Sequence, residues 1–423
     1  MPGIEPVDGI PHAGGRSDRY WNLSLLLLAC CVSVWAAWRI QGVGLTTDEF
    51  VHFPRIVRLL HGDFALWDQY SAMLPGYHAL VAAALSFVGA DSLNAARLIS
   101  LLFGLAAVAA FCSVRTHTDA HRHPLLVAQF LVFPLAFPFV FLVYTDIASL
   151  AFVTGAFAFA TVRRHWLAAT LMILAIAVRQ NNVLWLALLA LQSLGPHVHW
   201  SEKRIDAAAA ASVSAPYLFP ATAFVAFWLW NGSISAPNPQ AALNPDISLH
   251  LGNPFFLLFV AGILFPLHVL VGLRDAFDRF RQRPWLWSIP LLLFAGCWWG
   301  FNADHPLNAP ATGYELFLRA RLFSALNADP WLRILFGTVV VAAACGLASM
   351  SRLVNSAWVL YPTSLLYLTT LWMIDVRYLL IPATLWLATR RLSTPRIERA
   401  TCIYWIILSC ALFESIAEGK LFP

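Results

Sequence analysis

Long apolar runs separated by short polar breaks recur along nearly all 423 residues of this chain. A helix needs about 20 apolar residues to cross the hydrocarbon core of a bilayer, and a helix satisfies its own backbone amides there. The runs 21–40 and 94–114 have about that length. Charged residues make up 12% of the chain, against roughly 25% in soluble domains. The sequence therefore predicts an all-α polytopic membrane protein.

Apolar runs that end at charged residues or Pro predict about thirteen crossings. They cover residues 21–40, 94–114, 124–143, 147–162, 166–178, 183–194, 207–230, 254–273, 285–301, 331–350, 357–373, 378–389 and 401–416. No small-residue cleavage site follows the first run, so we expect a retained helix and not a removed signal peptide. We predict a cytoplasmic tail over residues 1–20 and a single transmembrane domain over 21–423.

The apolar stretch 75–89 is ambiguous, and the distribution of basic residues decides its placement. Cytoplasmic loops hold the Lys and Arg excess of a membrane protein. With the N-terminus inside and 75–89 not crossing, most of the 27 Lys and Arg residues lie in inside loops, whereas a crossing there would export most of them. We therefore expect 75–89 to be a half-inserted, interfacial helix on the outer face. The same test splits 166–194 into two crossings at Arg179.

Composition and motifs exclude several classes of function. The net charge of +5 suits cytoplasmic loops and argues against a nucleic-acid partner. All 7 Cys lie in apolar stretches without CxxC or His-paired spacing, so they predict neither disulfides nor a zinc site. No GxGxxG, Walker, HExxH or GxSxG pattern occurs, so nucleotide-binding, zinc and serine-hydrolase functions lack support.

The predicted topology gathers polar residues at helix ends on the outer face. Polar groups at membrane depth are costly and usually functional, and a site open to outer or lumenal water would need them there. The candidate site residues on this face are Asp48, Glu49, His52, Tyr144, Asp146, Arg179, Gln180, Asn181, His305, Arg377 and Tyr378.

The first outer loop, residues 41–92, begins its polar cluster with the sequence TTDE at 46–49. This has the form of a capping box, in which Thr46 caps a helix and Glu49 reaches back to the Thr46 amide. Apolar residues then recur at helical spacing at positions 50, 53, 57 and 60. We expect that apolar face to lie on the membrane, while Asp48, His52 and Arg55 share the face toward water.

Asp48 is the leading candidate for a general base. The helix dipole and free amides favour the ionised form of an Asp at a helix N-terminus, and a carboxylate takes a proton from a hydroxyl within hydrogen-bond reach. Glu49 would aid or replace it. The alternative is that Asp48 and Glu49 only cap a surface helix, and His52 alone is more typical of a hydrogen-bonded structural residue.

Other polar positions carry both a functional and a structural interpretation. Asp146 either binds substrate or caps the helix that follows it. Arg179 lies where two short apolar helices meet, and Arg recognises phosphate through paired hydrogen bonds. Arg377 either acts on substrate or only pairs with Asp375, and His305 has the weakest chemical argument.

The first outer loop resembles that of a known family. Residues 48–54 are DEFVHFP, followed by HGDF at 61–64, WD at 67–68 and LPGY at 74–77. This order is similar to the first lumenal loop of the dolichyl-phosphate-glucose-dependent alpha-1,2-glucosyltransferases, which add the last glucose to the lipid-linked oligosaccharide of asparagine-linked glycosylation. Further similar segments follow in order at 144–149, 163–166, 179–185, 230–232, 249–251, 305–306 and 377–382.

The resemblance implies a GT-C fold and a multi-span glycosyltransferase in which an acidic residue of the first outer loop, here Asp48, acts as base. It implies a polyprenyl- or dolichyl-phosphate-linked sugar donor and a glycan or lipid-linked glycan acceptor. It also adds Trp67 and Asp68 to the substrate-binding candidates. The site would face the periplasm or the lumen, in a bacterial inner membrane or the endoplasmic reticulum membrane.

We expect this chemistry to transfer a hexose, glucose by resemblance, in a single inverting displacement. Arg179, Arg377 and His305 would stabilise the leaving lipid phosphate electrostatically, and neither a metal nor another cofactor is required. One alternative is a transporter or flippase of lipid-linked sugars that forms no glycosidic bond. Such proteins place ionisable residues near the bilayer midplane in paired repeats, and no repeat is evident here. A non-catalytic scaffold in a glycan pathway is a third interpretation.

Overall fold

The computed structural model describes residues 16–67, 72–119, 124–199, 204–236, 243–245, 248–309, 317–350 and 355–422. Its α-helices are α1 (Arg16–Arg39), α2 (Glu49–Leu60), α3 (Gly76–Val88), α4 (Leu93–Asp119), α5 (Pro124–Leu131), α6 (Phe137–Val140), α7 (Thr145–Thr161), α8 (His165–Val178), α9 (Trp185–Leu194), α10 (Ala207–Asn231), α11 (Gly252–Leu264), α12 (Pro266–Gln282), α13 (Ser288–Gly300), α14 (Leu318–Ala328), α15 (Pro330–Ala348), α16 (Leu360–Thr369), α17 (Leu380–Thr389) and α18 (Pro395–Ala417).

Short 3₁₀ helices connect several of these elements. They are η1 (Ile40–Gly42), η2 (Gln180–Leu184), η3 (Gly195–His197), η5 (Pro284–Trp287), η6 (Pro306–Asn308), η7 (Asn355–Val359) and η8 (Val376–Leu379). One pair of two-residue antiparallel strands, β1 (Val198–His199) and β2 (Arg204–Ile205), lies between α9 and α10, with Val198 opposite Ile205. Apart from this pair, the regular structure of the described residues is helical.

Five helices of the described chain are long and apolar enough to cross a membrane. They are α1 with its 3₁₀ extension, α4, α10, α15 and α18. The pair α11 and α12 makes a sixth if its two bent halves count as one span. These helices agree with the predicted class, an all-α membrane protein that crosses the bilayer several times. The thirteen crossings and the GT-C fold stay predictions.

Two segments expected to be single crossings are broken. Residues 124–143 form α5 and α6 with a turn between them, and α11 bends by 104° into α12. Pro134, Pro138 and Pro266 stand at these breaks. Proline has no N–H to donate within a helix and disfavours helical backbone in the residue before it. The helix therefore breaks at each proline although the apolar run continues past it. The short helix α14 was not among the predicted segments.

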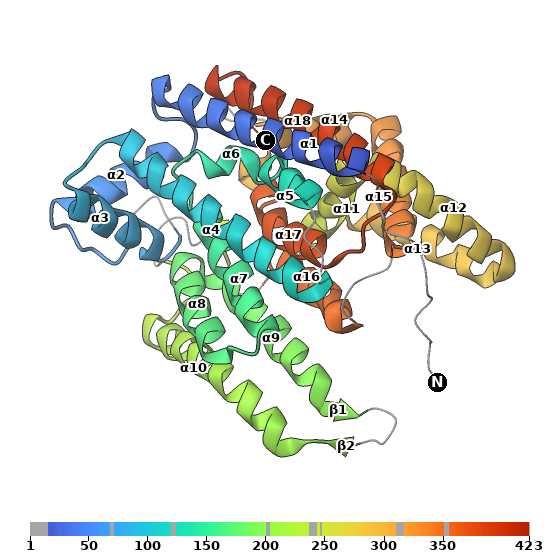
Figure 1. The fold of residues 1–423 in the computed structure, drawn as a ribbon, viewed down its shortest axis with the longest axis horizontal. Coiled ribbons are helices and arrows are strands. Elements are labelled where there is room, and N and C mark those ends of the chain that lie inside the picture. The colour runs from blue at the N-terminus through green and yellow to red at the C-terminus, as the bar shows by residue number, and fades with distance from the viewer. Residues whose placement is uncertain are drawn as a thin grey trace.

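Helix α7 lies at the centre of the bundle, packed between α4, α8 and α17 (Figure 1). Most of its side chains are buried, from Thr145 at its first position to Ala158 in its last turn. A helix that is apolar on every side is stable inside other helices or in lipid, and α7 is of the first kind. Because α7 is enclosed on all sides, the polar residues of its first turn are held in fixed positions.

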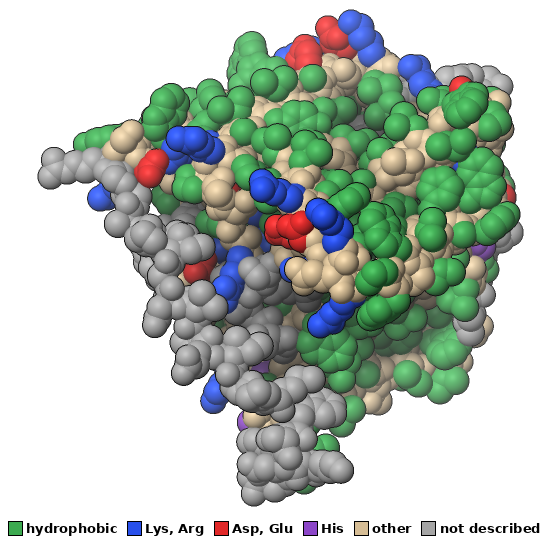
Figure 2. Space-filling view, turned by 90° about the vertical axis from the view of Figure 1, so that its right-hand side faces the viewer, with side chains coloured by type: hydrophobic (Ala, Val, Ile, Leu, Met, Phe, Trp, Pro, Cys, Tyr) green, Lys and Arg blue, Asp and Glu red, His purple; other side chains and the backbone are tan. Residues whose placement is uncertain are grey.

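Large apolar side chains cover much of the outside of the molecule. Phe87 is 92% exposed, Trp299 is 79% exposed and Trp331 is 77% exposed. Figure 2 shows one face on which hydrophobic side chains predominate and charged side chains gather in a few groups. Monomers in water rarely expose contiguous apolar area of this kind, so lipid is the natural neighbour of these surfaces.

Helices α2 and α3 pack against each other beside α4, and this corrects one expectation. Ile56 of α2 and Tyr77 of α3 belong to one buried apolar cluster. The same side of α2 carries His52 and Arg55, which are 2% and 3% exposed, while Phe50 is 63% exposed. The prediction that His52 and Arg55 face water was therefore wrong. In a lipid environment the apolar face of a helix can turn outward, because lipid and protein core are equally apolar.

Candidate functional site

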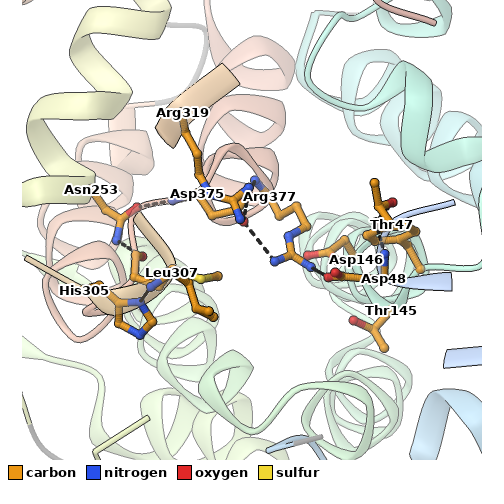
Figure 3. A network of polar contacts seen from close by, with 12 residues as sticks. Thr47, Asp48, Thr145, Asp146, Asn253, His305, Leu307, Arg319, Asp375 and Arg377 are labelled. Atoms are coloured by element: carbon orange, nitrogen blue, oxygen red, sulfur yellow. Dashed lines mark hydrogen bonds and ion pairs between the residues drawn. The ribbon is translucent and has the colours of Figure 1, made fainter. Parts of the chain in front are cut away.

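Asp48 occupies the position just before α2, and its side chain does not cap that helix. The carboxylate instead forms an ion pair with the Arg377 guanidinium, which comes from η8, more than 300 residues along the chain (Figure 3). The Asp48 side chain is 33% exposed, whereas that of Arg377 is 7% exposed. The pair therefore joins a fixed, buried cation to a carboxylate that remains open to a ligand.

Arg377 is held from behind by a second carboxylate. Its Nη2 lies 2.9 Å from Asp375 Oδ2, and Arg319 Nη1 lies 3.1 Å from the same oxygen. Burial raises the pKa of Asp375, but the cations Arg319 and Arg377 outweigh it and bring the pKa to about 2. The Asp375 amide donates to Asn253 Oδ1 at 3.2 Å, which ties this arrangement to α11. Asp375 is therefore ionised at neutral pH and fixes the Arg377 guanidinium.

A second buried ion pair lies beside the first. Arg179, at the end of α8, pairs with Asp146 in the first turn of α7, and both side chains are at most 7% exposed. Asp146 Oδ2 is buried without a hydrogen-bond partner among the described residues. The Arg179 guanidinium also lies over the Tyr378 ring, 5.2 Å from its centroid. Two cations, Arg179 and Arg377, thus flank the same polar region.

Tyr144 connects α7 to the turn before α2. Its hydroxyl accepts a hydrogen bond from the Asp48 amide at 2.9 Å and pairs with the Thr47 hydroxyl. The Arg377 guanidinium lies over the Tyr144 ring, 5.8 Å from its centroid. The structure thus brings together Asp48, Tyr144, Asp146, Arg179, Arg377 and Tyr378, which come from four distant segments of the chain.

Glu49 lies next to Asp48 in sequence but has a different environment. It is fully buried, and its carboxylate accepts from Arg97 Nε at 3.0 Å and from the amides of Val143 at 2.9 Å and Thr46 at 3.1 Å. The bond to the Thr46 amide is the reciprocal half of the predicted capping box, whereas the Asp48 position, and not Thr46, precedes the helix. Glu49 therefore holds the loop to α4 and α7, and both of its carboxylate oxygens are occupied by these protein donors.

His52 is enclosed behind Asp48 and Tyr144. Its Nδ1 lies 3.0 Å from His78 Nε2, and its second ring nitrogen has no partner among the described residues. Burial lowers the pKa of His52 to about 4, against the opposing effect of Asp48. A neutral, buried imidazole supports the turn and does not contact solvent.

The remaining predicted residues have separate roles. Gln180 donates to the carbonyls of Ala72 and Ile234, at 3.0 and 3.2 Å, and so joins two loops that are distant in sequence. Asn181 reaches the Tyr367 hydroxyl at 3.4 Å, and the Trp67 ring lies 6.1 Å from that of Phe227. His305 is buried, with Nε2 3.1 Å from the Leu243 carbonyl. Asp68 lies outside the described residues.

Sequence reasoning missed Asn253, Arg319 and the positioning of Thr47. Arg319 lies in α14, which has no long apolar run to draw attention, and Asn253 lies at the start of α11. The spacing of Asp375 and Arg377 was the one signal in the sequence for this part of the network. Within the described residues, no three His, Cys, Asp or Glu side chains lie close enough together to hold a metal ion.

Comparison with known proteins gives a family for part of the chain. The model of the DIE2/ALG10 family matches residues 45–209. A curated relative from Arabidopsis thaliana, a Dol-P-Glc:Glc(2)Man(9)GlcNAc(2)-PP-Dol alpha-1,2-glucosyltransferase, is 30% identical over 162 residues, which are 34% of this chain and 32% of the relative. The aligned region thus spans about a third of that relative's length, and no solved structure matches. The predicted resemblance is confirmed over this segment, and the chain is related through residues 45–209 to the DIE2/ALG10 family.

Proposed function

We propose that the protein is a membrane glycosyltransferase that moves a hexose from a polyprenyl- or dolichyl-phosphate to a hydroxyl group of a glycan or lipid-linked glycan. The name of the Arabidopsis relative supports glucose as the sugar and a dolichol-linked oligosaccharide as the acceptor. The observation that carries the proposal is the Asp48 carboxylate, one third exposed, paired with the buried Arg377, which also interacts electrostatically with Asp146 of the Arg179 pair.

Asp48 is the general base of this proposal. The acceptor hydroxyl gives its proton to the Asp48 carboxylate while its oxygen attacks the anomeric carbon of the donor sugar. The bond from that carbon to the phosphate oxygen breaks at the same time, and its electron pair leaves with the lipid phosphate. The configuration of the anomeric carbon inverts, because attack and departure occur on opposite sides.

Arg377 and Arg179 face the charge that develops on the leaving phosphate. Guanidinium groups bind phosphate through paired hydrogen bonds, and fixed cations are most effective where they need not reorganise during the reaction. Arg377 is fixed by Asp375 and also holds Asp48. A donor phosphate would compete with Asp48 for Arg377, so donor binding would release the carboxylate at the moment when a base is needed.

The test uses membranes that contain the protein, a labelled polyprenyl-phosphate hexose and a glycan acceptor. We expect Asp48→Asn to slow formation of the labelled glycoside about 10²–10⁴-fold, because the amide cannot take the proton. Asp63→Asn, which changes an exposed carboxylate of the same loop, is the matched control and should transfer at the wild-type rate. Wild-type transfer by Asp48→Asn would reject Asp48 as the base. Movement of labelled lipid between leaflets without a new glycosidic bond would support the transporter alternative.

A further inference from the structure

We infer that Tyr144 is a positioning residue, whose hydroxyl holds the turn at Thr47 and Asp48 in the conformation that aims the Asp48 carboxylate at Arg377. This role differs from the substrate contact that the sequence predicted for Tyr144, and it rests on the proposed function of Asp48 as base.

The backbone at Thr47 has an unusual conformation. Its φ is 48°, in the left-handed region, and the described chain has only one other non-glycine residue with positive φ, Arg163. A β-branched residue in this region is a true outlier, and such strain persists only where the surroundings impose it. Something near Thr47 must therefore hold the turn.

The Tyr144 hydroxyl is the group in a position to hold it. It pairs with the Thr47 hydroxyl and accepts the hydrogen bond from the Asp48 amide, so a single oxygen fixes both sides of the peptide that joins Thr47 to Asp48. That amide is one of the free donors at the start of α2, which need a partner when buried.

The turn determines where the Asp48 carboxylate points. An Asp before a helix usually has extended backbone and bonds an amide of the first turn with its side chain. Asp48 instead has helical backbone, with φ −70° and ψ −8°, and makes no such bond. Its carboxylate is therefore free of the helix and meets Arg377. If Thr47 relaxed to ordinary φ, the peptide plane before Asp48 would rotate and the carboxylate would leave Arg377.

The Tyr144 ring is itself fixed and enclosed. It is fully buried. The Phe422 ring stacks on it at 6.0 Å with an angle of 19° between the planes, and the Phe139 and His52 rings lie 5.2 and 5.8 Å away. A side chain enclosed in this way is a rigid support for the turn, and it offers no surface to a sugar.

The test is a double-mutant comparison in the transfer assay. Tyr144→Phe should lower kcat about tenfold, the loss expected from one to two hydrogen bonds, with the KM values for donor and acceptor unchanged. Adding Thr47→Gly should restore most of the lost kcat, because glycine adopts positive φ without strain and the turn no longer needs the tether. Tyr217→Phe, which removes another buried tyrosine hydroxyl bonded to His165 at 3.0 Å, is the control and should retain wild-type kcat.

Two results would overturn the inference. One is a Thr47→Gly, Tyr144→Phe double variant as slow as Tyr144→Phe, which would show that Tyr144 does not act by holding the strained turn. The other is a rise in the KM of the donor or acceptor in place of the fall in kcat, which would show that Tyr144 contacts substrate. Wild-type transfer by Asp48→Asn would instead reject the proposed base, and hydrogen exchange would then decide whether Tyr144 holds the turn.

Hydrogen exchange gives an assay that needs no activity. The amides of residues 45–52 should exchange faster in Tyr144→Phe than in wild type, and Tyr217→Phe should leave them unchanged. Equal protection of this segment in wild type and Tyr144→Phe would also overturn the inference, even if the protein transferred no sugar.

Discussion

Two arginines at opposite ends of one helical segment, Arg377 before α17 and Arg390 after it, each meet a carboxylate, and the two carboxylates have opposite environments. Glu398 is 1% exposed and accepts from Arg390 Nη1 and Nη2, both at 2.7 Å. His268 Nε2, at 3.1 Å, Gln129 Nε2, at 2.9 Å, and the Ser393 amide, at 2.8 Å, are further partners of its carboxylate. Asp48, in contrast, pairs with one cation among the described residues and has a side chain that is 33% exposed.

This difference in exposure and in hydrogen-bond partners distinguishes a structural ion pair from a carboxylate that can bind a ligand. A buried carboxylate whose oxygens all accept hydrogen bonds has no room for a ligand, and its removal leaves several buried donors unpaired. A carboxylate that is one third exposed, opposite a fixed cation, keeps lone pairs available. Glu49 belongs with Glu398 in this respect, although it is the neighbour of Asp48 in sequence.

The sharpest separation should come from Asp48→Asn. Loss of a general base lowers the rate about 10²–10⁴-fold. The thermal unfolding midpoint in detergent should hardly move, because Asp48 is partly exposed and Asn has the same shape as Asp. Rates from the labelled-lipid assay and unfolding curves on the same preparation check this. A large fall in the midpoint would show that Asp48 is a structural carboxylate like Glu398, contrary to the difference proposed here.

Glu398→Ala should show the reverse pattern. Breaking one side of a buried ion pair costs about 3–5 kcal/mol of unfolding free energy, so the protein should unfold at a much lower temperature, while protein that stays folded keeps its transfer rate. Glu418→Ala, which removes the surface pair with Lys420, is the control and should leave the midpoint close to wild type. If Glu398→Ala lowers the rate of the folded protein, the second network also takes part in function.

Acid should weaken the region behind Asp48. The folded pKa of His52 is about 4 and the unfolded value is 6.5, so the unfolded chain binds more protons between these values. Its contribution to stability is complete above pH 6.5 and falls away as pH drops to 4, by roughly 3 kcal/mol in all.

His52→Gln should therefore reduce the fall of the unfolding midpoint between pH 6.5 and 4. His61→Gln, at an exposed position of the same loop, should leave the fall as large as in wild type. The same acid sensitivity in His52→Gln as in wild type would show that another group titrates.

The smallest effect should come from Arg377→Lys. Lysine keeps the charge but loses the fork that meets Asp375 and Asp48 together, which should slow transfer roughly tenfold, equivalent to about 1.5 kcal/mol. Arg274→Lys, at an exposed position of α12, should be silent. An Arg377→Lys variant with wild-type transfer would mean that charge alone suffices.

The sequence predicted the helical class, most segment positions and most of the cluster around Asp48. It did so because apolar runs and charged ends are local signals, and because the basic residues placed distant polar segments on one face. The contact between Asp48 and Arg377 agrees with that placement. The helix breaks at Pro134, Pro138 and Pro266 could also have been predicted from the sequence, because proline acts on the backbone next to it.

Other features depend on packing that the sequence does not display. In water, a polar stripe on a helix predicts the exposed face, and this rule put His52 and Arg55 on the wrong side of α2. Where lipid surrounds the protein, the polar stripe can face the protein interior and the apolar one the lipid, as Phe50 does. The role of Arg319 was equally hidden, because its partner Asp375 is distant in sequence.

The contact between Asp48 and Arg377 constrains the membrane topology of the chain. Two groups that touch must lie on the same side, so an even number of crossings separates residues 48 and 377. The 104° bend between α11 and α12 lies within that interval. If this bent pair is one crossing, the other crossings between residues 48 and 377 must be odd in number. If the pair does not cross, they must be even in number.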